Sequence, residues 1–391
     1  MCYEGYNAMK MLMDGARFLK NVGYYEVETQ EELRLLLERG GEIKRYCFQN
    51  LDFTELHNFS CLFKDCMFMG CSFKEGMKKQ IDKSCLVFSR LDTPYNAFRN
   101  SLYSAKNLYY GYRKGYPESY SDSYDSIVYQ HYLEKGKVAT DIKETLARTL
   151  HDRAISDALH DFLADYDGRR IVGIMGGHGI LRTDKYYRKI VDISKSLTEK
   201  GYLMVSGGGP GAMEATHVGA WMAGRVEEEV DRVMEMLSLS PSYSDSGWLD
   251  SAFRVMDEFP QNKYNSLGVP TWLYGHEPST PFATHIAKYF DNAIREDGIL
   301  TIAMGGVIYT PGSAGTMQEI FQDAVQNHYL SFGYASPMVF LGEKYWMEEM
   351  PVYPMLQELL EKGKYRNLLL SISDDTKRVI AEIETFTTKE D

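Results

Sequence analysis

Short apolar runs alternate with longer amphipathic stretches from residue 171 towards the end of the chain. Ile171–Met175 and Tyr202–Val205 predict buried strands, and Asp184–Glu199 between them predicts a helix that stops at Gly201. The same patterns predict further strands at 271–274, 306–310 and 337–341, and further helices at 226–237, 284–296, 314–328, 345–361 and 375–386. Strands that alternate with helices form a parallel sheet with helices on both faces. We therefore expect an α/β fold over this part of the chain.

The N-terminal third follows different patterns. Residues 26–40 predict one amphipathic helix, in which Thr29 is the cap and Glu32 completes a capping box. Beyond this helix, phenylalanines recur at a spacing of five residues with one gap, at Phe48, Phe53, Phe63, Phe68 and Phe73. This spacing resembles a pentapeptide repeat, in which the chain coils as a square β-helix and stacks like side chains inside. We expect such a segment over residues 46–75.

Cys61, Cys66 and Cys71 belong to the same five-residue ladder. Zinc ligands usually occur as closely spaced cysteine pairs, with a second pair or with histidines. Here a phenylalanine accompanies the cysteine at every step, which favours packed and reduced thiols. We therefore expect no metal site and mostly unpaired cysteines.

Ten tyrosines lie between residues 95 and 132. Aromatic side chains at this density can stack on nucleic-acid bases, but few arginines lie nearby. Tyrosine also suits interfaces, so we expect an irregular arm whose rings pack on the next domain or on a partner subunit. A long helix is predicted over 141–165. We divide the chain into an N-terminal extension, residues 1–140, and an α/β domain, residues 141–391.

Composition narrows the possible partners and compartment. The 391 residues include 43 basic and 55 acidic side chains, for a formal net charge of −12. This balance argues against nucleic acid and against an anionic membrane, because both require a basic surface. Glu4, Lys10 and Asp14 interrupt the N-terminal region where a signal peptide would be apolar. The uncharged stretch 298–317 contains five glycines and a proline, which does not suit a membrane span. We expect a cytoplasmic protein.

Glycine-rich turns follow three of the predicted strands and precede predicted helices, at 176–179, 206–211 and 311–316. In parallel sheets, ligands bind at the carboxyl ends of the strands, near the point where the strand order reverses. Backbone N–H groups at a helix N-terminus bind anions, and glycine lets the ligand come close. One such turn has little specificity, but three on one domain predict a nucleotide or phosphate ligand. None of them fits a P-loop or the G-x-G-x-x-G order.

Two of these turns carry a family resemblance. Residues 206–214, SGGGPGAME, resemble the first signature of the Lonely Guy (LOG) family, and residues 311–319, PGSAGTMQE, resemble its second signature, P-G-G-x-G-T-x-x-E. Ser313 departs from the second glycine of that signature. The match covers about 171–342. It implies a modified Rossmann fold and a homo-oligomer, and the N-terminal third resembles an extension found on one bacterial branch of LOG-like proteins.

The resemblance also implies an activity. The family hydrolyses a nucleoside 5′-monophosphate to free base and ribose 5-phosphate, so we expect a phosphoribohydrolase that needs no cofactor and takes a purine, AMP-like monophosphate. Many relatives carry the label of lysine decarboxylase. That chemistry would need pyridoxal phosphate on a lysine, and no lysine lies within or immediately beside the three turns.

The same resemblance assigns catalytic roles to Glu319 and Arg295. A carboxylate stabilises the oxocarbenium-like charge that develops as an N-glycosidic bond breaks, and an arginine binds phosphate or ribose hydroxyls. Each has a structural alternative: Glu319 as an acid favoured early in a helix, and Arg295 as a cation near a helix end. Ligand contacts are expected from Gly312, Ser313, Ala314, Gly315, Thr316, Gly207, Gly208, Gly209, Met213, Glu214, Gly176, Gly177 and His178.

Two functions stay open. The first is the hydrolase, and the second is a non-catalytic module that senses a nucleotide with the same turns. The presence of Glu319 favours the enzyme, because a binding module could lose this carboxylate and keep its affinity for phosphate.

Overall fold

The structure is a computed structural model that describes residues 23–54 and 60–388. The chain divides into two compact units. The first takes the chain up to Leu102 together with His131–Asp165, and the second takes Tyr103–Gln130 together with the chain from Tyr166 onwards. Most of the tyrosine-rich arm therefore belongs to the second unit, and this division differs from the boundary expected at residue 140.

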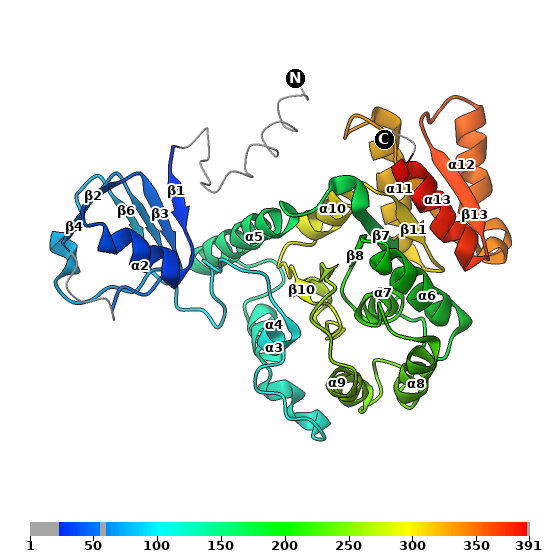
Figure 1. The fold of residues 1–391 in the computed structure, drawn as a ribbon, viewed down its shortest axis with the longest axis horizontal. Helices are drawn as coiled ribbons and strands as arrows, with labels where there is room; N and C mark the ends of the chain where they lie inside the picture. Colours follow the sequence, from blue (N-terminus) through cyan, green and yellow to red (C-terminus); the bar gives the residue numbers. More distant parts are fainter. Residues whose placement is uncertain (1–22, 55–59, 389–391) are drawn as a thin grey trace. The chain divides into compact units, whose positions relative to one another are not determined.

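The second unit contains a seven-stranded sheet in which all pairs are parallel (Figure 1). Its order is β10-β9-β8-β7-β11-β12-β13. The bounds are β7 (Ile171–Met175), β8 (Leu203–Ser206), β9 (Ser266–Gly268), β10 (His285–Ile286), β11 (Val307–Tyr309), β12 (Pro337–Leu341) and β13 (Leu369–Ser373). The strand order reverses between β7 and β11, which is where a doubly wound sheet binds its ligand.

Helices cover both faces of this sheet. They are α6 (Lys185–Glu199), α7 (Ala212–Trp221), α8 (Glu227–Ser238), α9 (Trp248–Glu258), α10 (Asn292–Ile302), α11 (Ala314–Tyr329), α12 (Val352–Glu361) and α13 (Thr376–Thr388). α6 packs against α7 and α13, and α10 packs against α11. Apolar residues of the strands and of the helices that cover them are buried together in the core of this unit. The predicted α/β, Rossmann-like fold is confirmed.

Two elements of the structure differ from those predicted, because contacts with residues far away in the sequence determine their conformation. The predicted strand at 271–274 is a short 3-10 turn, η5 (Trp272–Tyr274), whose indole donates to Asp125 at 2.9 Å. The predicted helix at 284–296 begins only at Asn292, because β10 uses the residues before it and Asp291 caps the helix.

A third difference concerns the C-terminal region. The predicted helix at 345–361 is interrupted: a π-helical turn (Tyr345–Glu349) comes first, and α12 begins after Pro351, which cannot continue a preceding helix. The helix α9 and the strands β9 and β13 were not predicted from the sequence.

The part of the tyrosine-rich arm that belongs to the second unit packs its rings on the rest of that unit. Packing on the following domain is one of the two arrangements expected from the sequence. Its elements are α3 (Ala105–Leu108), η3 (Pro117–Asp122) and the start of α4 (Tyr124–Glu134). Tyr109 and Tyr112 pack against Phe253 of α9, with ring centroids 5.4 and 5.8 Å away. Tyr103 exchanges two backbone hydrogen bonds with Ile286 of β10, at 2.8 and 2.9 Å.

The first unit contains a short parallel coil. Its elements are β1 (Tyr25–Val27), α2 (Gln30–Glu38), β2 (Gly41–Lys44), β3 (Tyr46–Gln49), β4 (Cys61–Lys64), β5 (Met67–Met69), η2 (Met77–Lys79) and β6 (Leu86–Phe88). Strand pairing places Phe48 beside Phe68 and Ile43 beside Phe63, so each turn of the coil takes twenty residues, or four pentapeptides. The predicted pentapeptide-like segment is confirmed, although the predicted helix at 26–40 is shortened by β1.

Aromatic rings fill the interior of this coil. Phe48 and Phe68 stack with centroids 5.0 Å apart, and Phe53 and Phe73 stack at 5.5 Å. Cys61, Cys66 and Cys71 are buried in the same cluster as these rings. The five cysteines among the described residues are free: Cys47, Cys61, Cys66, Cys71 and Cys85. Burial raises the pKa of the Cys66 thiol to about 11, so it stays protonated at neutral pH. The expectation of packed, unpaired thiols is confirmed for these residues.

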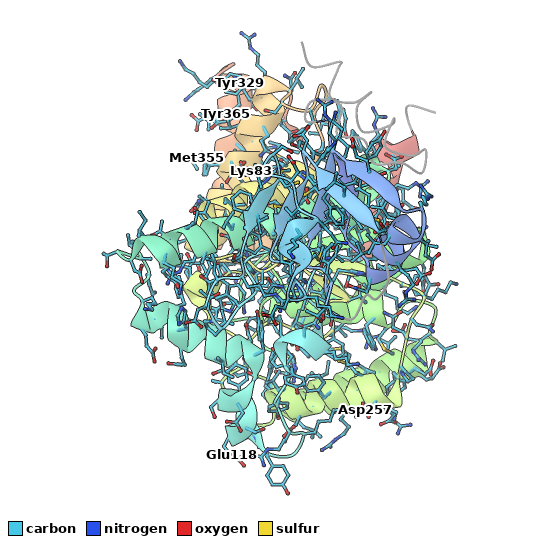
Figure 2. The ribbon with its side chains drawn as sticks, turned by 90° about the vertical axis from the view of Figure 1, so that its left-hand side faces the viewer. Lys83, Glu118, Asp257, Tyr329, Met355 and Tyr365 are labelled. Carbon is cyan, nitrogen blue, oxygen red and sulfur yellow. The ribbon has the colours of Figure 1, made fainter. Side chains whose placement is uncertain are left out.

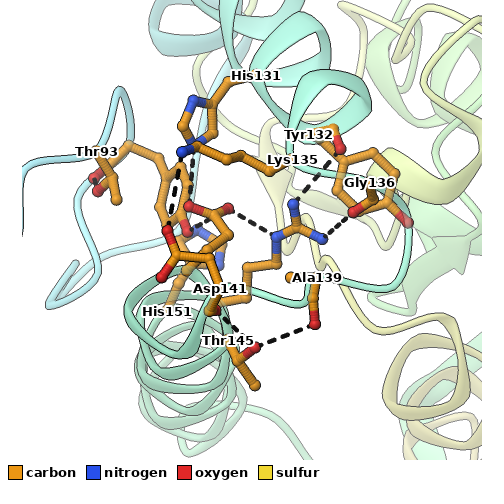
Figure 3. Close-up of polar contacts among 12 residues, drawn as sticks. Thr93, His131, Tyr132, Lys135, Gly136, Ala139, Asp141, Thr145 and His151 are labelled. Atoms are coloured by element: carbon orange, nitrogen blue, oxygen red, sulfur yellow. Dashed lines mark hydrogen bonds and ion pairs between the residues drawn. The ribbon is translucent and has the colours of Figure 1, made fainter.

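A buried ion pair joins the end of α4 to α5 (Ile142–Leu163) in the first unit (Figure 3). Glu144 accepts a hydrogen bond from Arg148 Nε at 2.8 Å and from the hydroxyl of Tyr95 at 3.1 Å. His131 Nε2 lies 2.9 Å from its other carboxylate oxygen. Burial alone would raise the pKa of Glu144, but its contacts with His131 and Arg148 outweigh burial and hold the pKa below its ordinary value.

Replacing Glu144 by alanine should destabilise the first unit strongly. The change leaves the Arg148 guanidinium buried without its carboxylate, and breaking one half of a buried pair costs about 3–5 kcal/mol. The control is Glu42→Ala, which breaks the exposed pair with Lys64 and should cost less than about 1 kcal/mol. Denaturant unfolding of the full chain measures both, and equal losses would contradict the prediction.

Candidate functional site

The three glycine-rich turns form one structure at the carboxyl edge of the sheet. They follow β8, β7 and β11, which are neighbours in the sheet. The N–H of Gly177 donates to the carbonyl of Pro311 at 3.0 Å, and the N–H of Ala212 donates to the carbonyl of Gly177 at 3.1 Å. The middle turn therefore binds both of the others through its backbone. The turns that the sequence predicted as ligand sites meet at the point where the strand order reverses.

Close backbone packing explains why several of these residues are glycines. Gly211 has a φ of +69°, and a Cβ there would press against the carbonyl oxygens of Gly177 and His178. A Cβ on Gly312 would lie 3.0 Å from the backbone nitrogen of Gly177. No atom lies within 4 Å of the place where a Cβ on Gly315 would sit. Gly315 therefore borders open space, whereas Gly211 and Gly312 serve the contact between turns.

The start of α11 is open to solvent at this edge. Ser313 precedes the helix and its side chain makes no capping hydrogen bond, and Ser313, Ala314 and Gly315 are all exposed. The hydroxyl of Tyr345 donates to the carbonyl of Gly312 at 2.6 Å and so fixes the turn from behind. The first N–H groups of a helix have no partner within the helix and carry partial positive charge. This end of α11 is suited to an anion.

Arg295 and Glu319 are brought together beside these turns. Arg295 lies on α10, is buried, and donates from Nε to the carbonyl of Val269 at 2.9 Å. Its guanidinium lies against Gly207, where no Cβ would fit, and one terminal nitrogen is 3.7 Å from Oε1 of Glu319. The structure thus brings together the turn after β8, α10 and α11, as expected for a common site. The catalytic roles of both residues stay predictions.

The electrostatics of Glu319 follow from its burial. Only 9% of the residue is exposed, and burial raises the pKa of its carboxyl to about 7, against the opposing effect of Arg295. One turn later on α11, burial also raises the pKa of Asp323 to about 7, although the hydroxyl of Tyr309 donates to it at 2.7 Å. Near neutral pH, α11 therefore carries two carboxyl groups that can gain or lose a proton.

Other predicted contact residues take different positions. Glu214 is fully buried and accepts two hydrogen bonds from Arg182, at 2.9 and 2.6 Å, and one from the Tyr187 hydroxyl at 2.8 Å. Its carboxylate is therefore held by side chains of the protein. Met213 covers the turn, with its side chain against Gly207 and Gly209. Gly176 is packed against the side chain of Thr310, so its lack of a Cβ has a structural reason.

The loop between β9 and β10 is a part of the site that the glycine patterns did not reveal. Thr280 donates its N–H to the carbonyl of Gly208 at 2.8 Å. The carboxylate of Glu277 lies close to Gly209 and 3.8 Å from Nδ1 of His178, whose side chain is half exposed. The loop has neither a glycine-rich turn nor a periodic pattern, and the sequence named only its turn at 276–278 as a possible member of the pocket, with a weaker claim than the glycine-rich turns. Among the described residues, no group of three or more His, Cys, Asp or Glu side chains is placed to hold a metal ion.

No protein-family model and no curated protein matches this chain. Solved structures match part of it. The Moco carrier protein of Chlamydomonas rheinhardtii is 16% identical, with a TM-score of 0.34 over 56% of this chain and 98% of that chain. The molybdenum cofactor binding protein of the phototrophic bacterium Rippkaea orientalis is 15% identical, with a TM-score of 0.35 over 56% of this chain and 97% of that chain. At these values the likeness carries no argument about the ligand of this chain.

These findings correct the resemblance drawn from the sequence. The solved structures named above are molybdenum cofactor carriers and binders, and neither a family model nor a curated protein supports the LOG family. The expected LOG membership, the phosphoribohydrolase function and the nucleoside monophosphate partner are therefore contradicted, as is the alternative nucleotide sensor. The two glycine-rich signatures are short and also serve turn-to-turn packing, which explains why they misled. Enzymatic activity and a homo-oligomer stay predictions.

The raised pKa of Glu319 predicts a pH-dependent stability. Its ordinary value is near 4.5, so between about pH 4.5 and 7 the folded chain holds a proton here that the unfolded chain has released. This contribution to stability is fully present below pH 4.5 and is lost as the pH rises through 7. Glu319→Gln removes the dependence, so at pH 8 the variant should be more stable than the wild type by up to about 3 kcal/mol.

The measurement is chemical unfolding of wild type and variant at pH 5 and pH 8. Glu358→Gln serves as the control, because the carboxylate of Glu358 on α12 is 60% exposed and paired only with Lys362 in an adjacent turn. Because this control keeps Glu319, its stability should follow that of the wild type at both pH values. A Glu319→Gln variant that gains nothing over the wild type at pH 8 would show that Glu319 is not a buried acid of raised pKa.

Proposed function

We propose that the second unit is a binding module for a small ligand that carries a phosphate group or a comparable oxyanion. One observation carries the proposal: three interlocked glycine-rich turns meet the open N-terminus of α11 at the switch point of the sheet. Backbone N–H groups and the helix dipole favour negative charge at such a place. The exposed backbone of Ser313, Ala314 and Gly315 is the expected contact surface.

Arg295 supports the same proposal from another element. Its buried guanidinium lies between Gly207 of one turn and Glu319 of α11. A fixed guanidinium forms charge-assisted hydrogen bonds with phosphate oxygens. Glu319 would oppose an anion when ionised, and its pKa of about 7 means that it is partly neutral at the pH of most cells. The site thus combines backbone donors with one fixed cation and a carboxyl that can become neutral.

The proposal concerns the phosphate or oxyanion group of the ligand and assigns no chemistry to the rest of the molecule. Among the described helices, none is long and apolar enough to cross a membrane. A cytoplasmic location, as the sequence suggested, forms part of the proposal.

Changing Gly315 tests the anion site without disturbing the fold. Gly315→Asp places a carboxylate at the open start of α11, where it repels an anion but suits the helix dipole. We expect affinity for inorganic phosphate to fall by about tenfold or more, because the new carboxylate repels the anion, while the melting temperature holds or rises. Calorimetry with inorganic phosphate measures the affinity.

Gly315→Ala is the matched control. It adds a methyl group into open space and no charge, and it should keep the affinity for phosphate. If wild type and Gly315→Asp bind phosphate equally, the ligand does not contact the start of α11 and the proposal is wrong.

A further inference from the structure

The loop between β9 and β10, residues 269–284, forms one wall of the proposed anion site. Val269 accepts a hydrogen bond from Arg295 Nε at 2.9 Å, and Thr280 donates to the carbonyl of Gly208 at 2.8 Å. Both the cation of the site and the turn after β8 are therefore held by this loop. Because the loop has little regular structure of its own, contacts with another part of the chain must fix its position.

The tyrosine-rich arm holds this loop from the other side. The hydroxyl of Tyr109 donates to the carbonyl of Ser279, the residue next to Thr280. Asp125 accepts from the indole of Trp272 at 2.9 Å, at the start of the loop. The Ser279–Thr280 pair is thus bound on one side by the arm and on the other by the turn that lines the site.

A buried ion pair makes this docking specific. Nζ of Lys288 donates to Oδ1 of Asp125 at 2.6 Å and to Oγ of Ser279 at 3.0 Å. The side chains of Lys288 and Asp125 are each 1% exposed. A fully buried charge is strongly unfavourable unless it is paired and hydrogen-bonded. The arm therefore has to dock in the one register that pairs Asp125 with Lys288. The same register fixes the position of Ser279, because Lys288 also donates to its hydroxyl.

We propose that the arm, residues 103–130, is a positioning element of the anion site: it holds the 269–284 loop, and through that loop Gly208 and Arg295, in the geometry that binds the ligand. The proposal rests on the proposed function, since it assumes an anion at the three turns. It gives the arm a role that its tyrosines alone do not suggest. By linkage, a ligand at the turns must stabilise the docked arm by the same factor by which the docked arm improves binding.

Two tyrosines of the arm provide a matched pair of variants. The rings of Tyr109 and Tyr112 both pack on Phe253, and each hydroxyl makes a hydrogen bond to the second unit. The hydroxyl of Tyr109 reaches Ser279 in the loop, whereas that of Tyr112 reaches Asp250 of α9 at 2.7 Å, away from the loop. Changing each to phenylalanine removes one hydroxyl and keeps the ring, so the pair compares a hydroxyl bound to the loop with one bound to α9.

Affinity for inorganic phosphate is the first readout, measured on the full chain by calorimetry. Tyr109→Phe should weaken phosphate binding about five- to tenfold, because it leaves a buried carbonyl of the loop without its donor. Tyr112→Phe should change it less than about twofold, because its partner lies on α9. A further variant, Asp125→Asn, should weaken binding by more than Tyr109→Phe. Melting temperatures establish that each variant is folded.

Protection of the arm by phosphate is the second readout, and a merely structural arm would not show it. Arg113 and Lys114 are exposed on the arm, and Lys114 forms an ion pair with Asp257 of α9. Asp257 is labelled in Figure 2. Saturating phosphate should slow tryptic cleavage at these two residues in the wild type and in Tyr112→Phe, and less in Tyr109→Phe.

The outcomes separate the two proposals. If the wild type binds no phosphate, the proposed function fails and this inference fails with it. If the wild type binds phosphate, but Tyr109→Phe and Tyr112→Phe bind it alike and phosphate protects neither from trypsin more than the other, the anion site stands and the arm is not its positioning element.

Discussion

Two backbone hydrogen bonds, from Gly177 to Pro311 and from Ala212 to Gly177, are the contacts on which the site depends. They hold the turns after three neighbouring strands at a distance that only glycine allows, as the positive φ of Gly211 shows. With the turns locked together, the first N–H groups of α11 face outwards and cannot be satisfied from within the helix. The anion site is thus a consequence of how the strands end, and side chains add to it.

Burial controls the protonation state of the carboxyl groups beside this edge of the sheet. Arg295 is held by the carbonyl of Val269, and Glu319 has no hydrogen-bond donor as close as that of Asp323. Burial raises the pKa of the Glu319 and Asp323 carboxyl groups, so α11 carries two side chains that respond to pH near neutrality. Where a charge is structural, as in Glu214 with Arg182, it is surrounded by donors instead.

The two units are stabilised by different means. The coil of the first unit is closed by stacked phenylalanines and free thiols that repeat at a fixed interval, so its register follows from one spacing. The second unit depends on contacts between distant segments, such as Asp125 with Lys288 and Tyr103 with Ile286. An arm that precedes the sheet in sequence thereby holds the loop that forms one wall of the proposed site.

The sequence by itself determined what local rules control. Period and length predicted the parallel sheet, most of its helices and the pentapeptide-like coil, and glycine after strands predicted where three turns would lie. Arg295 and Glu319 were also named from the sequence, although for a chemistry that the comparisons contradict. Only the tertiary structure decided that Glu214 belongs to a buried ion pair, that Trp272 turns out of a strand towards Asp125, and that the 269–284 loop borders the site. These features depend on partners far away in the chain, and the free energy of burying a charge or an indole is set by those partners rather than by the neighbouring residues.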